Sequence, residues 1–491
     1  MQLKLVMKQK SIKINFFFNI LLNISKVLFP LITAPYIARV LEPDGVGLFN
    51  FSNVYAGYFA LFAALGIPMY GIREVAKIRD DPKELNKFVS EVISISVVST
   101  ILCTLAYLIS IFSISQLNEN SIIFLVAGIL LYTTPFRIDW FFSGKEEFGY
   151  ITIRSLIIKT LSIIALFLFV HQKTDLIYYI IINVCSLVIN EIWNYVMLYK
   201  AGIRPYFTLS GMHHIKPICI LFASVVAASI YTVLDTIMLG FMTDYSQVGF
   251  YNSAQHISKS LLPIATSLAT VTMPRLSYYF KDAKWDQIND LVKKSISAIS
   301  FLSFPISFGV ICIAPEFVPL FYGEHFVKAI YPLQIIMGVV IAIGFSNLFG
   351  TQILLGLGKD KILLLTIIVG TVSNFTLNIF LIPHYGAIGA SIASLIAEVL
   401  VTAAGYYLVK KTTPIIMGCK KEIFLCFVAV IFFIPIKLLL KQFIDGWILV
   451  FAFMFIGSTF YLAFQYFTKN SSMQLFIDLV KKKINRKKTY A

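Results

Sequence analysis

Charged residues are scarce in this sequence. Asp, Glu, Lys and Arg make up 13% of its 491 residues, against about 25% in an ordinary soluble domain. Apolar residues make up 58%, and the mean hydropathy is +0.82. So little polar surface cannot cover a water-soluble fold. Apolar runs of about 20 residues or more, each long enough to cross hydrocarbon as a helix, recur along the chain. The sequence therefore predicts an all-α polytopic membrane protein.

Several features of soluble enzymes are missing as well. No loop between the apolar runs is long enough for a soluble catalytic domain, which needs roughly 100 residues, and no phosphate-binding P-loop motif occurs. No Ser/His/Asp or Cys/His set can be assembled without crossing the membrane arbitrarily. We therefore expect a protein that is not an enzyme, with no catalytic residues and no cofactor.

Metal-binding residues do not gather in the sequence. The six cysteines include no Cys-x-x-Cys pair and lie in apolar runs or at their ends, which indicates neither a disulfide nor a zinc site. His213 and His214 are adjacent, but no carboxylate or thiol accompanies them. The sequence therefore predicts no metal site.

The apolar runs predict about fourteen transmembrane helices. Their approximate bounds are 14–40, 48–72, 88–113, 121–142, 151–170, 176–199, 215–242, 248–273, 291–314, 326–352, 362–382, 387–409, 422–440 and 447–467. Four lysines precede the first run, as in a signal peptide. That run is too long for a signal sequence and lacks a small-residue cleavage site, so we interpret it as the first span. The start, Met1 or Met7, is left open.

Lys and Arg residues set the expected orientation. Alternate loops and the two ends hold 32 of the 41 basic residues, and the opposite loops hold five. Basic loops stay in the cytoplasm, so both termini are expected there, in a multi-pass protein of the cell inner membrane. The net charge of +16 lies in these short loops and in the tail 469–491. This placement favours contact with anionic membrane lipids and argues against nucleic acid as a partner.

Short motifs repeat after six predicted spans. Val46-Gly47-Leu48-Phe49-Asn50 matches Val248-Gly249-Phe250-Tyr251-Asn252, and Gly144-Lys145-Glu146 matches Gly358-Lys359-Asp360. Ser186-Leu187 with Glu191 likewise matches Ser394-Leu395 with Glu398. An even offset gives both halves the same orientation, as in parallel-repeat transporters. The predicted domains are a six-helix bundle (1–205), its repeat (206–411), two additional helices (412–468) and a basic cytoplasmic tail (469–491).

Polar side chains recur at helical spacing inside several runs. Such stripes form on one face of a helix, where they either line a cavity or hydrogen-bond to neighbouring helices. Two of the stripes contain a lysine, which helix-to-helix bonding does not require. We therefore predict substrate-binding residues in the first, eighth and eleventh spans: Asn19, Asn23 and Lys26, then Asn252, His256 and Lys259, then Asn374 and Asn378.

Further charges lie inside the predicted spans. Each costs roughly 2.5–3.5 kcal/mol at mid-membrane if it faces lipid, so we expect these groups around water or in pairs. Asp235, Glu191 and Glu398 are candidates for ion coupling, with structural pairing as the alternative. Arg137 and Asp139, near the cytoplasmic end of the fourth span, are candidates for a cytoplasmic entry, an ion pair or an interface anchor.

Four stretches resemble one known family. They are Pro35 to Gly47, Asp139 to Gly144, Leu234 to Gly240, and Phe321 to Phe326 leading to Gly356 to Lys361. In this order they resemble the signature of the O-antigen flippases (Wzx), which are part of the multidrug/oligosaccharidyl-lipid/polysaccharide exporter superfamily. Glu42 stands where this family commonly has glycine, a departure that we expect to matter little in an exposed turn.

The resemblance implies two six-helix bundles that form a V and move undecaprenyl-diphosphate-linked oligosaccharide from the cytoplasmic to the periplasmic leaflet. It also implies a polysaccharide polymerase and a chain-length regulator as partners. Lysines suit a diphosphate and asparagines suit sugar hydroxyls, so Lys26 and Lys259 are expected to face one cavity. A drug/cation antiporter and a peptidoglycan-precursor flippase of the same superfamily are the alternatives, and antiport of an ion is a candidate driving force.

Overall fold

The apolar runs fold into helices. The computed structural model describes residues 12–418, 420–474 and 477, and within them some side chains also lie outside the description (12, 13, 26, 224, 227, 228, 230–232 and 268–271). In the described part every regular element is helical, which confirms the all-α class. Nine described helices are long and apolar enough to cross a membrane. Two of them, α1 (Ile12–Ala64) and α14 (Asp360–Thr412), each contain a sharp break. The number fourteen stays a prediction.

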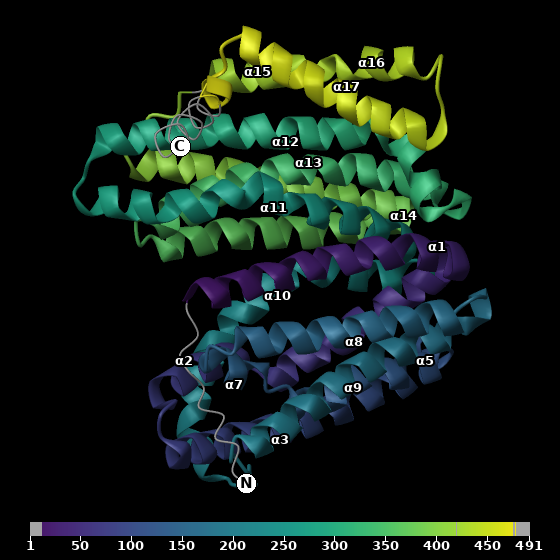
Figure 1. Ribbon diagram of the computed structural model, residues 1–491, viewed down its shortest axis with the longest axis vertical. Helices are drawn as coiled ribbons and strands as arrows, with labels where there is room; N and C mark the ends of the chain where they lie inside the picture. Colours follow the sequence, from purple (N-terminus) through teal and green to yellow (C-terminus); the bar gives the residue numbers. More distant parts are fainter. Residues whose placement is uncertain (1–11, 419, 475–476, 478–491) are drawn as a thin grey trace, which may run out of the picture. The chain divides into compact units, whose positions relative to one another are not determined.

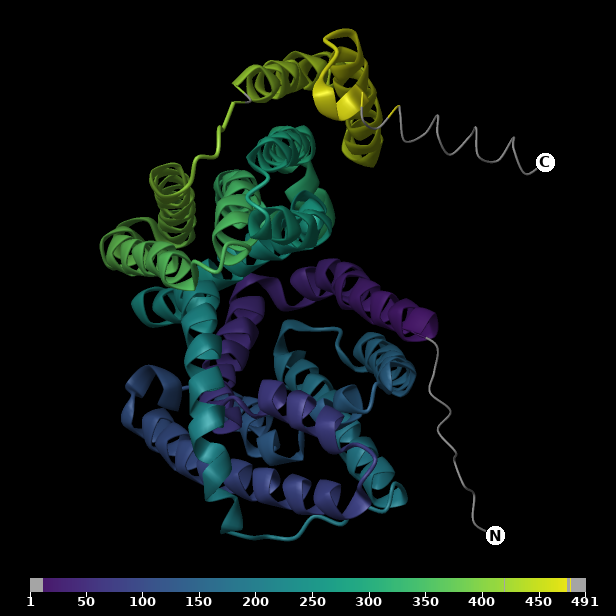
Figure 2. The ribbon, with the colours of Figure 1, turned by 90° about the vertical axis from the view of Figure 1, so that its left-hand side faces the viewer.

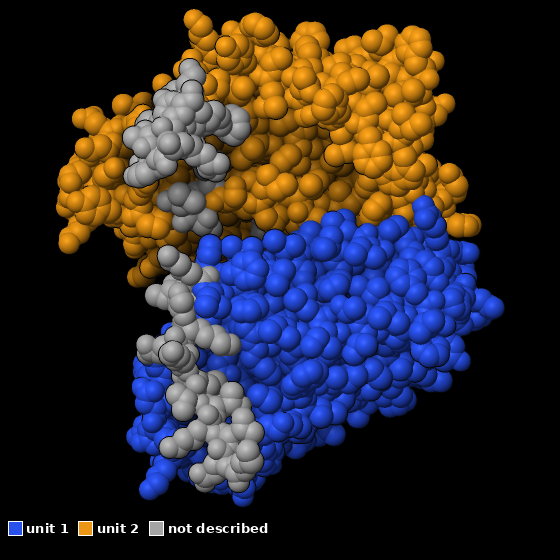
Figure 3. Space-filling view, in the orientation of Figure 1, with its two compact units in different colours: residues 1–241 blue, residues 242–491 orange. Residues whose placement is uncertain are grey.

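The chain divides into two compact units, residues 1–241 and 242–491 (Figure 3). Unit 1 holds α1 and the elements up to α10, although the sequence repeat assigned 206–241 to the second half. After α1 these elements are α2 (Ile67–Ile78), α3 (Pro82–Ser113), α4 (Ser115–Asn118), α5 (Ser121–Ala127), α6 (Ile129–Tyr132), η1 (Thr134–Phe136), α7 (Asp139–Gly144), α8 (Phe148–Phe169), η2 (Lys173–Asp175), α9 (Leu176–Lys200), η3 (Ser210–His214) and α10 (Ile215–Met242).

Close packing explains why α10 belongs to unit 1. A Cβ on Gly240 would lie 2.2 Å from the ring of Phe51 in α1, so only glycine allows this approach. Gln116 donates a hydrogen bond to the Gly240 carbonyl, and Phe222 stacks edge-on against Phe62. Both ends of α10 are thus held by unit 1, and the helix is continuous between them (Figure 2).

Unit 2 is built around α12, which packs against α11, α13, α15 and α17 (Figure 1). Its elements are α11 (Tyr245–Lys281), α12 (Trp285–Tyr322), η4 (Glu324–Ala329), α13 (Ile330–Asn347), η5 (Leu348–Leu355), α14, α15 (Lys420–Ile431), α16 (Phe433–Leu440) and α17 (Gly446–Phe467). The helices after the repeat are attached by an ion-pair triad. Glu316 of α12 lies 2.7 Å from Lys437 and 2.9 Å from Lys441.

Burial runs opposite to that of a soluble protein. Large apolar side chains lie on the outside, with Phe16 67%, Phe455 73% and Phe467 79% exposed. Polar side chains such as Asn194 and Asn378 are fully buried. Large exposed apolar surfaces are unfavourable in water. In hydrocarbon, a polar group finds hydrogen-bond partners only within the protein. The solvent that matches this pattern is the lipid bilayer.

The break in α1 lies at Glu42, with φ 57° and ψ 178°. This region of backbone space is almost restricted to glycine and costs another residue about 1–3 kcal/mol. Glu42 keeps a compensating ion pair, because its carboxylate lies 2.8 Å from Lys173. The backbone of this turn therefore favours glycine, and the expectation that glutamate matters little here stays a prediction.

The predicted span 121–142 is not one helix. It divides into α5, α6, η1 and α7, and Pro135 has no N–H to continue a helix at η1. Arg137 donates a hydrogen bond of 2.5 Å to the carbonyl of Leu130. A broken helix inside a membrane needs such replacement partners for its backbone.

The repeated motifs adopt similar local structures. Asn50 donates to the Val46 carbonyl at 2.9 Å, and Asn252 donates to the Val248 carbonyl at 3.0 Å. The turns after α7 and η5 are closed by the same kind of hydrogen bond, from a backbone amide to the carbonyl five residues earlier. The amide of Glu147 donates to the carbonyl of Phe142, and the amide of Lys359 donates to the carbonyl of Leu354. Such turns end helices through a left-handed residue, here Glu146 and Gly358.

The break in α1 yields a first prediction. Alanine and glycine at position 42 both remove the ion pair with Lys173, but only glycine removes the strain at φ 57°. We expect Glu42→Gly to be more stable than Glu42→Ala by about 1–2 kcal/mol, the reverse of their usual order in a helix. Thermal unfolding of both purified variants measures this. An alanine variant as stable as the glycine variant would contradict the strain.

Candidate functional site

Three of the predicted intramembrane charges lie together in unit 1. Arg137 and Glu191 lie within electrostatic range of each other and of Asp139, and a fourth charge, Arg154 of α8, completes the group. We call these four residues, with Asn190 and Asn194, the charge cluster. Two cations face two anions, so the cluster is balanced without a counterion from outside.

The centre of the charge cluster is the ion pair between Arg154 and Asp139. Nη2 of Arg154 lies 2.7 Å from Oδ1 of Asp139, and the arginine side chain is only 2% exposed. Its Nε donates to Oδ1 of Asn190 at 3.0 Å. The guanidinium also lies over the ring of Tyr150, 5.2 Å from its centroid. A buried guanidinium is costly unless it has such partners. Because the partners of Arg154 come from α7, α8 and α9, these contacts hold the three helices in one arrangement.

Helix α9 presents three polar residues to this pair. Asn190 and Asn194 are one helical turn apart and therefore share a face. Asn194 donates to Oδ1 of Asp139 at 3.0 Å and accepts from the hydroxyl of Tyr150 at 3.3 Å. Glu191 lies between them in sequence and is 6% exposed.

Hydrogen-bonding capacity is left over in the charge cluster. Among the described residues, Oε2 of Glu191, Nη1 of Arg154 and Nε of Arg137 are buried and have no hydrogen-bond partner. Buried polar atoms are rarely left in this state. They can accept or donate to a hydroxyl, a phosphate oxygen or an ion that reaches them.

A groove of about 660 Å³ gives access to Glu191. It runs along α9 and is mostly apolar and aromatic. Its lining residues are Thr133, Phe136, Val188, Glu191, Ile192, Tyr195, Val196, Tyr199 and Lys200. A carboxylate in an apolar groove is suited to binding a cation or a proton, and Lys200 adds one positive charge to the lining.

The predicted stripe of the first span lies on the surface of unit 1. Asn19 and Asn23 are exposed, and Nδ2 of Asn23 donates to Oδ1 of Asn19 at 3.0 Å. The side chain of Lys26 is outside the described residues. Asp235 of α10 is 5% exposed and lies within electrostatic range of Tyr58.

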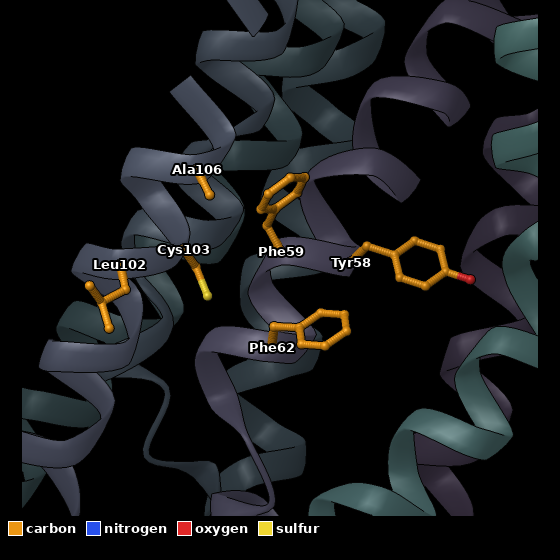
Figure 4. A pocket seen from close by; sticks show the side chains of 6 residues that line it. All are labelled: Tyr58, Phe59, Phe62, Leu102, Cys103 and Ala106. Atoms are coloured by element: carbon orange, nitrogen blue, oxygen red, sulfur yellow. The ribbon is translucent and has the colours of Figure 1, made fainter. Parts of the chain in front are cut away.

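Tyr58 borders a second, smaller pocket of about 340 Å³. The other residues around it are apolar or weakly polar: Phe59, Phe62, Leu102, Cys103 and Ala106. The hydroxyl of Tyr58 points away from these five side chains (Figure 4). This pocket therefore offers apolar surface and no group that would bind a charged ligand.

The remaining predicted residues lie in unit 2. On α11, Asn252 and His256 are half-buried, whereas Lys259 is exposed. On α14, Asn374 and Asn378 are 5% and 0% exposed and hydrogen-bond to each other at 3.1 Å. Glu398, on the same helix, is 7% exposed. The two asparagines of α14 thus resemble internal partners more than a cavity lining.

Sequence analysis missed the role of Arg154 because it counted this residue, near the start of the predicted span 151–170, among the 32 basic residues of the cytoplasmic loops and ends. The structure places it inside α8, and Asp139 pairs with it. The signal lay in the sequence as Asn190, Glu191 and Asn194, three polar residues within five positions of one apolar run.

The structure also corrects the account of the histidine pair. Glu91 of α3 lies 3.0 Å from Nε2 of His214, so a carboxylate does accompany His213 and His214. The sequence could not show this because Glu91 and His214 are 123 residues apart. Burial lowers the pKa of His214, and its hydrogen bond with Glu91 opposes that shift.

Two solved structures share this fold. One is the lipid II flippase MurJ in an inward closed conformation, with a TM-score of 0.74 and 18% identity over 95% of this chain and 100% of that one. The other is a multidrug resistance MATE transporter of the MOP superfamily in an inward-facing conformation. Its TM-score is 0.57, with 15% identity over 79% of this chain and 96% of that one. At these identities the likeness shows the fold alone.

Comparisons of sequence show the family. The chain is similar to a protein of Escherichia coli (strain K12) named "Putative O-antigen transporter", with 26% identity over 389 residues, 77% of this chain and 92% of that protein. A family model described as MatE matches residues 220–380, and one described as polysaccharide biosynthesis protein matches residues 12–280, more than half of the chain. The chain therefore belongs to the polysaccharide biosynthesis protein family, which confirms its resemblance to the Wzx-type members of the exporter superfamily.

Proposed function

We propose that this protein is a flippase for undecaprenyl-diphosphate-linked oligosaccharide. It moves a repeat unit of the O-antigen or capsule type from the cytoplasmic to the periplasmic leaflet of the cell inner membrane by alternating access. Both termini lie in the cytoplasm in this account. Membership of the polysaccharide biosynthesis family and similarity to a protein named for O-antigen transport support the substrate class.

One observation carries the proposal. Helices that present apolar side chains to their surroundings enclose a charge cluster with unused hydrogen-bonding capacity. A sugar hydroxyl without a partner costs several kcal/mol in hydrocarbon, so a repeat unit needs polar groups inside the membrane. Partially bonded Arg154 and Glu191 supply donors and an acceptor inside unit 1.

We assign the diphosphate to lysines. The ammonium groups of Lys26 and Lys259 would attract it, while the prenyl chain stays in lipid. Lys259 is exposed on α11, as this role requires. The exposed amides of Asn19 and Asn23 would bond to sugar hydroxyls, with Asn252 and His256 in the corresponding role on α11. The buried Asn374 and Asn378 would support their helix.

Arg137 and Asp139 act in this proposal as positioning residues. Each is engaged by the fold, Arg137 by the Leu130 carbonyl and Asp139 by Arg154 and Asn194. Asp139 therefore holds the first turn of α7 against α8 and α9, and Arg137 holds the preceding turn against α6.

Ion coupling is assigned to Glu191. Of the three candidate carboxylates, Glu191 lines an accessible groove and has an oxygen without a partner among the described residues. Asp235 and Glu398 are buried as well, and they would act in the conformational change. A membrane potential is worth about 2.3 kcal/mol per charge per 100 mV, and a carboxylate that binds and releases a proton in each cycle would couple transfer to it.

A drug/cation antiporter of the same superfamily is the second candidate. The groove beside Glu191 favours it, because Phe136, Tyr195 and Tyr199 give the combination of an acid and aromatic rings that suits an organic cation. Transport of cationic dyes by membrane vesicles would distinguish it, since a flippase for an anionic lipid should not accumulate them.

The flippase proposal is tested in cells that lack the gene. We expect deletion to abolish surface polysaccharide and the intact gene to restore it. The double variant Lys26→Ala/Lys259→Ala should restore less than a tenth of it, because the diphosphate loses both cations, yet insert into the membrane normally. Lys328→Ala, which removes a lysine from an outward loop, is the matched control. Normal polysaccharide in the double variant would contradict the assignment of the lysines, and normal polysaccharide in the deletion strain would contradict the substrate class.

Coupling through Glu191 is tested in inverted membrane vesicles. A potential of 100 mV that drives one charge per cycle multiplies the accumulation ratio by roughly 50. Glu191→Gln cannot bind and release a proton, so we expect its transport to be the same with and without the gradient. Glu398→Gln is the control and should keep its gradient dependence. The assignment is wrong if Glu191→Gln still responds to the gradient or if only Glu398→Gln loses the response.

A further inference from the structure

The segment between α9 and α10 is bound along one face of α3. Three side chains of α3, spaced four residues apart, accept hydrogen bonds from every second backbone amide of this segment. Asn86 accepts from Arg204 at 2.6 Å, Ser90 accepts from Tyr206 at 3.2 Å, and Ser94 accepts from Thr208 at 3.0 Å. Asp81 caps the first turn of α3 by accepting from the amides of Lys83 and Glu84. The segment therefore reaches η3 in a fixed position relative to α3.

This arrangement brings η3 into contact with Glu91. A Cβ on Gly211 would lie 2.8 Å from the Cβ of Glu91, so glycine permits the approach. The carboxylate of Glu91 and the rings of His213 and His214 then converge, and one ligand atom from each lies within 4.8 Å of the others. Glu91 is 3% and His214 8% exposed, whereas His213 lies at the surface.

The remaining polar atoms of the two buried residues are already engaged. The hydroxyl of Tyr70 is hydrogen-bonded to Nδ1 of His214 at 2.7 Å, and Ser210 donates to Oε1 of Glu91 at 3.0 Å. Nε2 of His214 and Oε2 of Glu91 consequently face each other. Metal ligands in proteins typically have such partners on their second atom, which fix the ring tautomer and the orientation of the carboxylate.

We propose that Glu91, His213 and His214 form a binding site for a divalent transition-metal ion of the Zn²⁺ type. Two imidazoles and a carboxylate suit Zn²⁺ or Co²⁺, whereas Mg²⁺ and Ca²⁺ prefer oxygen ligands alone. Tetrahedral Zn²⁺ with bonds of about 2.0–2.1 Å holds its ligand atoms about 3.3 Å apart. Oε2 of Glu91 and Nε2 of His214, 3.0 Å apart, are already near that spacing, and His213 would have to bring its ligand atom to the same spacing from within 4.8 Å.

The bound ion would connect the α9–α10 segment to α3 through its ligands. Three protein ligands leave one coordination position for water or an anion, and the exposed ring of His213 places that position at the surface. The site is separate from the charge cluster, so it would fix the packing of unit 1 without taking part in the transfer of substrate.

The test is metal binding by the full chain, purified with an affinity tag that contains no histidine. After removal of metals with a chelator, we expect the protein to bind one Zn²⁺ ion per chain. Co²⁺ in its place should give the visible absorption of a tetrahedral site. His213→Ala and Glu91→Gln should each weaken Zn²⁺ binding at least tenfold. Tyr70→Phe keeps all three ligands but should weaken binding roughly 10-fold by freeing the ring of His214.

His325→Ala is the matched control, because it removes a histidine from η4 in unit 2. The His213 variant changes a surface side chain, so its fold should survive, and thermal unfolding without metal checks this. The proposal is overturned if wild-type protein binds no stoichiometric Zn²⁺. It is equally overturned if His213→Ala and Glu91→Gln bind Zn²⁺ as tightly as the His325 variant.

Discussion

The bilayer gives a buried polar group no partner except the protein itself, and the ion pair between Arg154 and Asp139 shows how this chain meets that constraint. A guanidinium with 2% exposure would be prohibitive in an apolar helix by itself. Asp139, Asn190 and the ring of Tyr150 together make it tolerable. Because these partners come from α7, α8 and α9, the need to satisfy one side chain fixes the packing of three helices.

The same constraint accounts for other parts of the fold. Where α5, α6 and η1 interrupt a span, Arg137 replaces a missing backbone partner. Where the helices after the repeat pack against α12 within unit 2, Glu316 of α12 forms ion pairs with two lysines. Polar residues in this chain therefore act as connections between helices, and the few with unused hydrogen-bonding capacity stand out. Among those in the charge cluster, Glu191 lines a groove, which is why the proposed function relies on Glu191 and on the neighbouring Arg154.

Much of the helical fold could be predicted from the composition of the chain and from the regular recurrence of its apolar runs. Apolar runs and the positions of Lys and Arg predicted a polytopic all-α protein, and the motifs from Pro35 to Gly47 predicted its family. Contacts between distant segments could not be predicted, since Arg154 resembled a loop residue and Glu91 lies 123 residues from His214. The strain at Glu42 was missed for another reason. The motif shows that glutamate stands where glycine is common, but it does not give the φ angle of Glu42.

The central claim is that polar groups inside this protein carry a glycan across hydrocarbon, and transfer in reconstituted liposomes tests it most directly. Undecaprenyl-diphosphate-linked oligosaccharide would be placed in one leaflet, and its exposure in the other would be followed with a membrane-impermeant glycosidase. The account predicts transfer at least ten times faster than in protein-free liposomes. Transfer no faster than in liposomes that hold an unrelated membrane protein would contradict it.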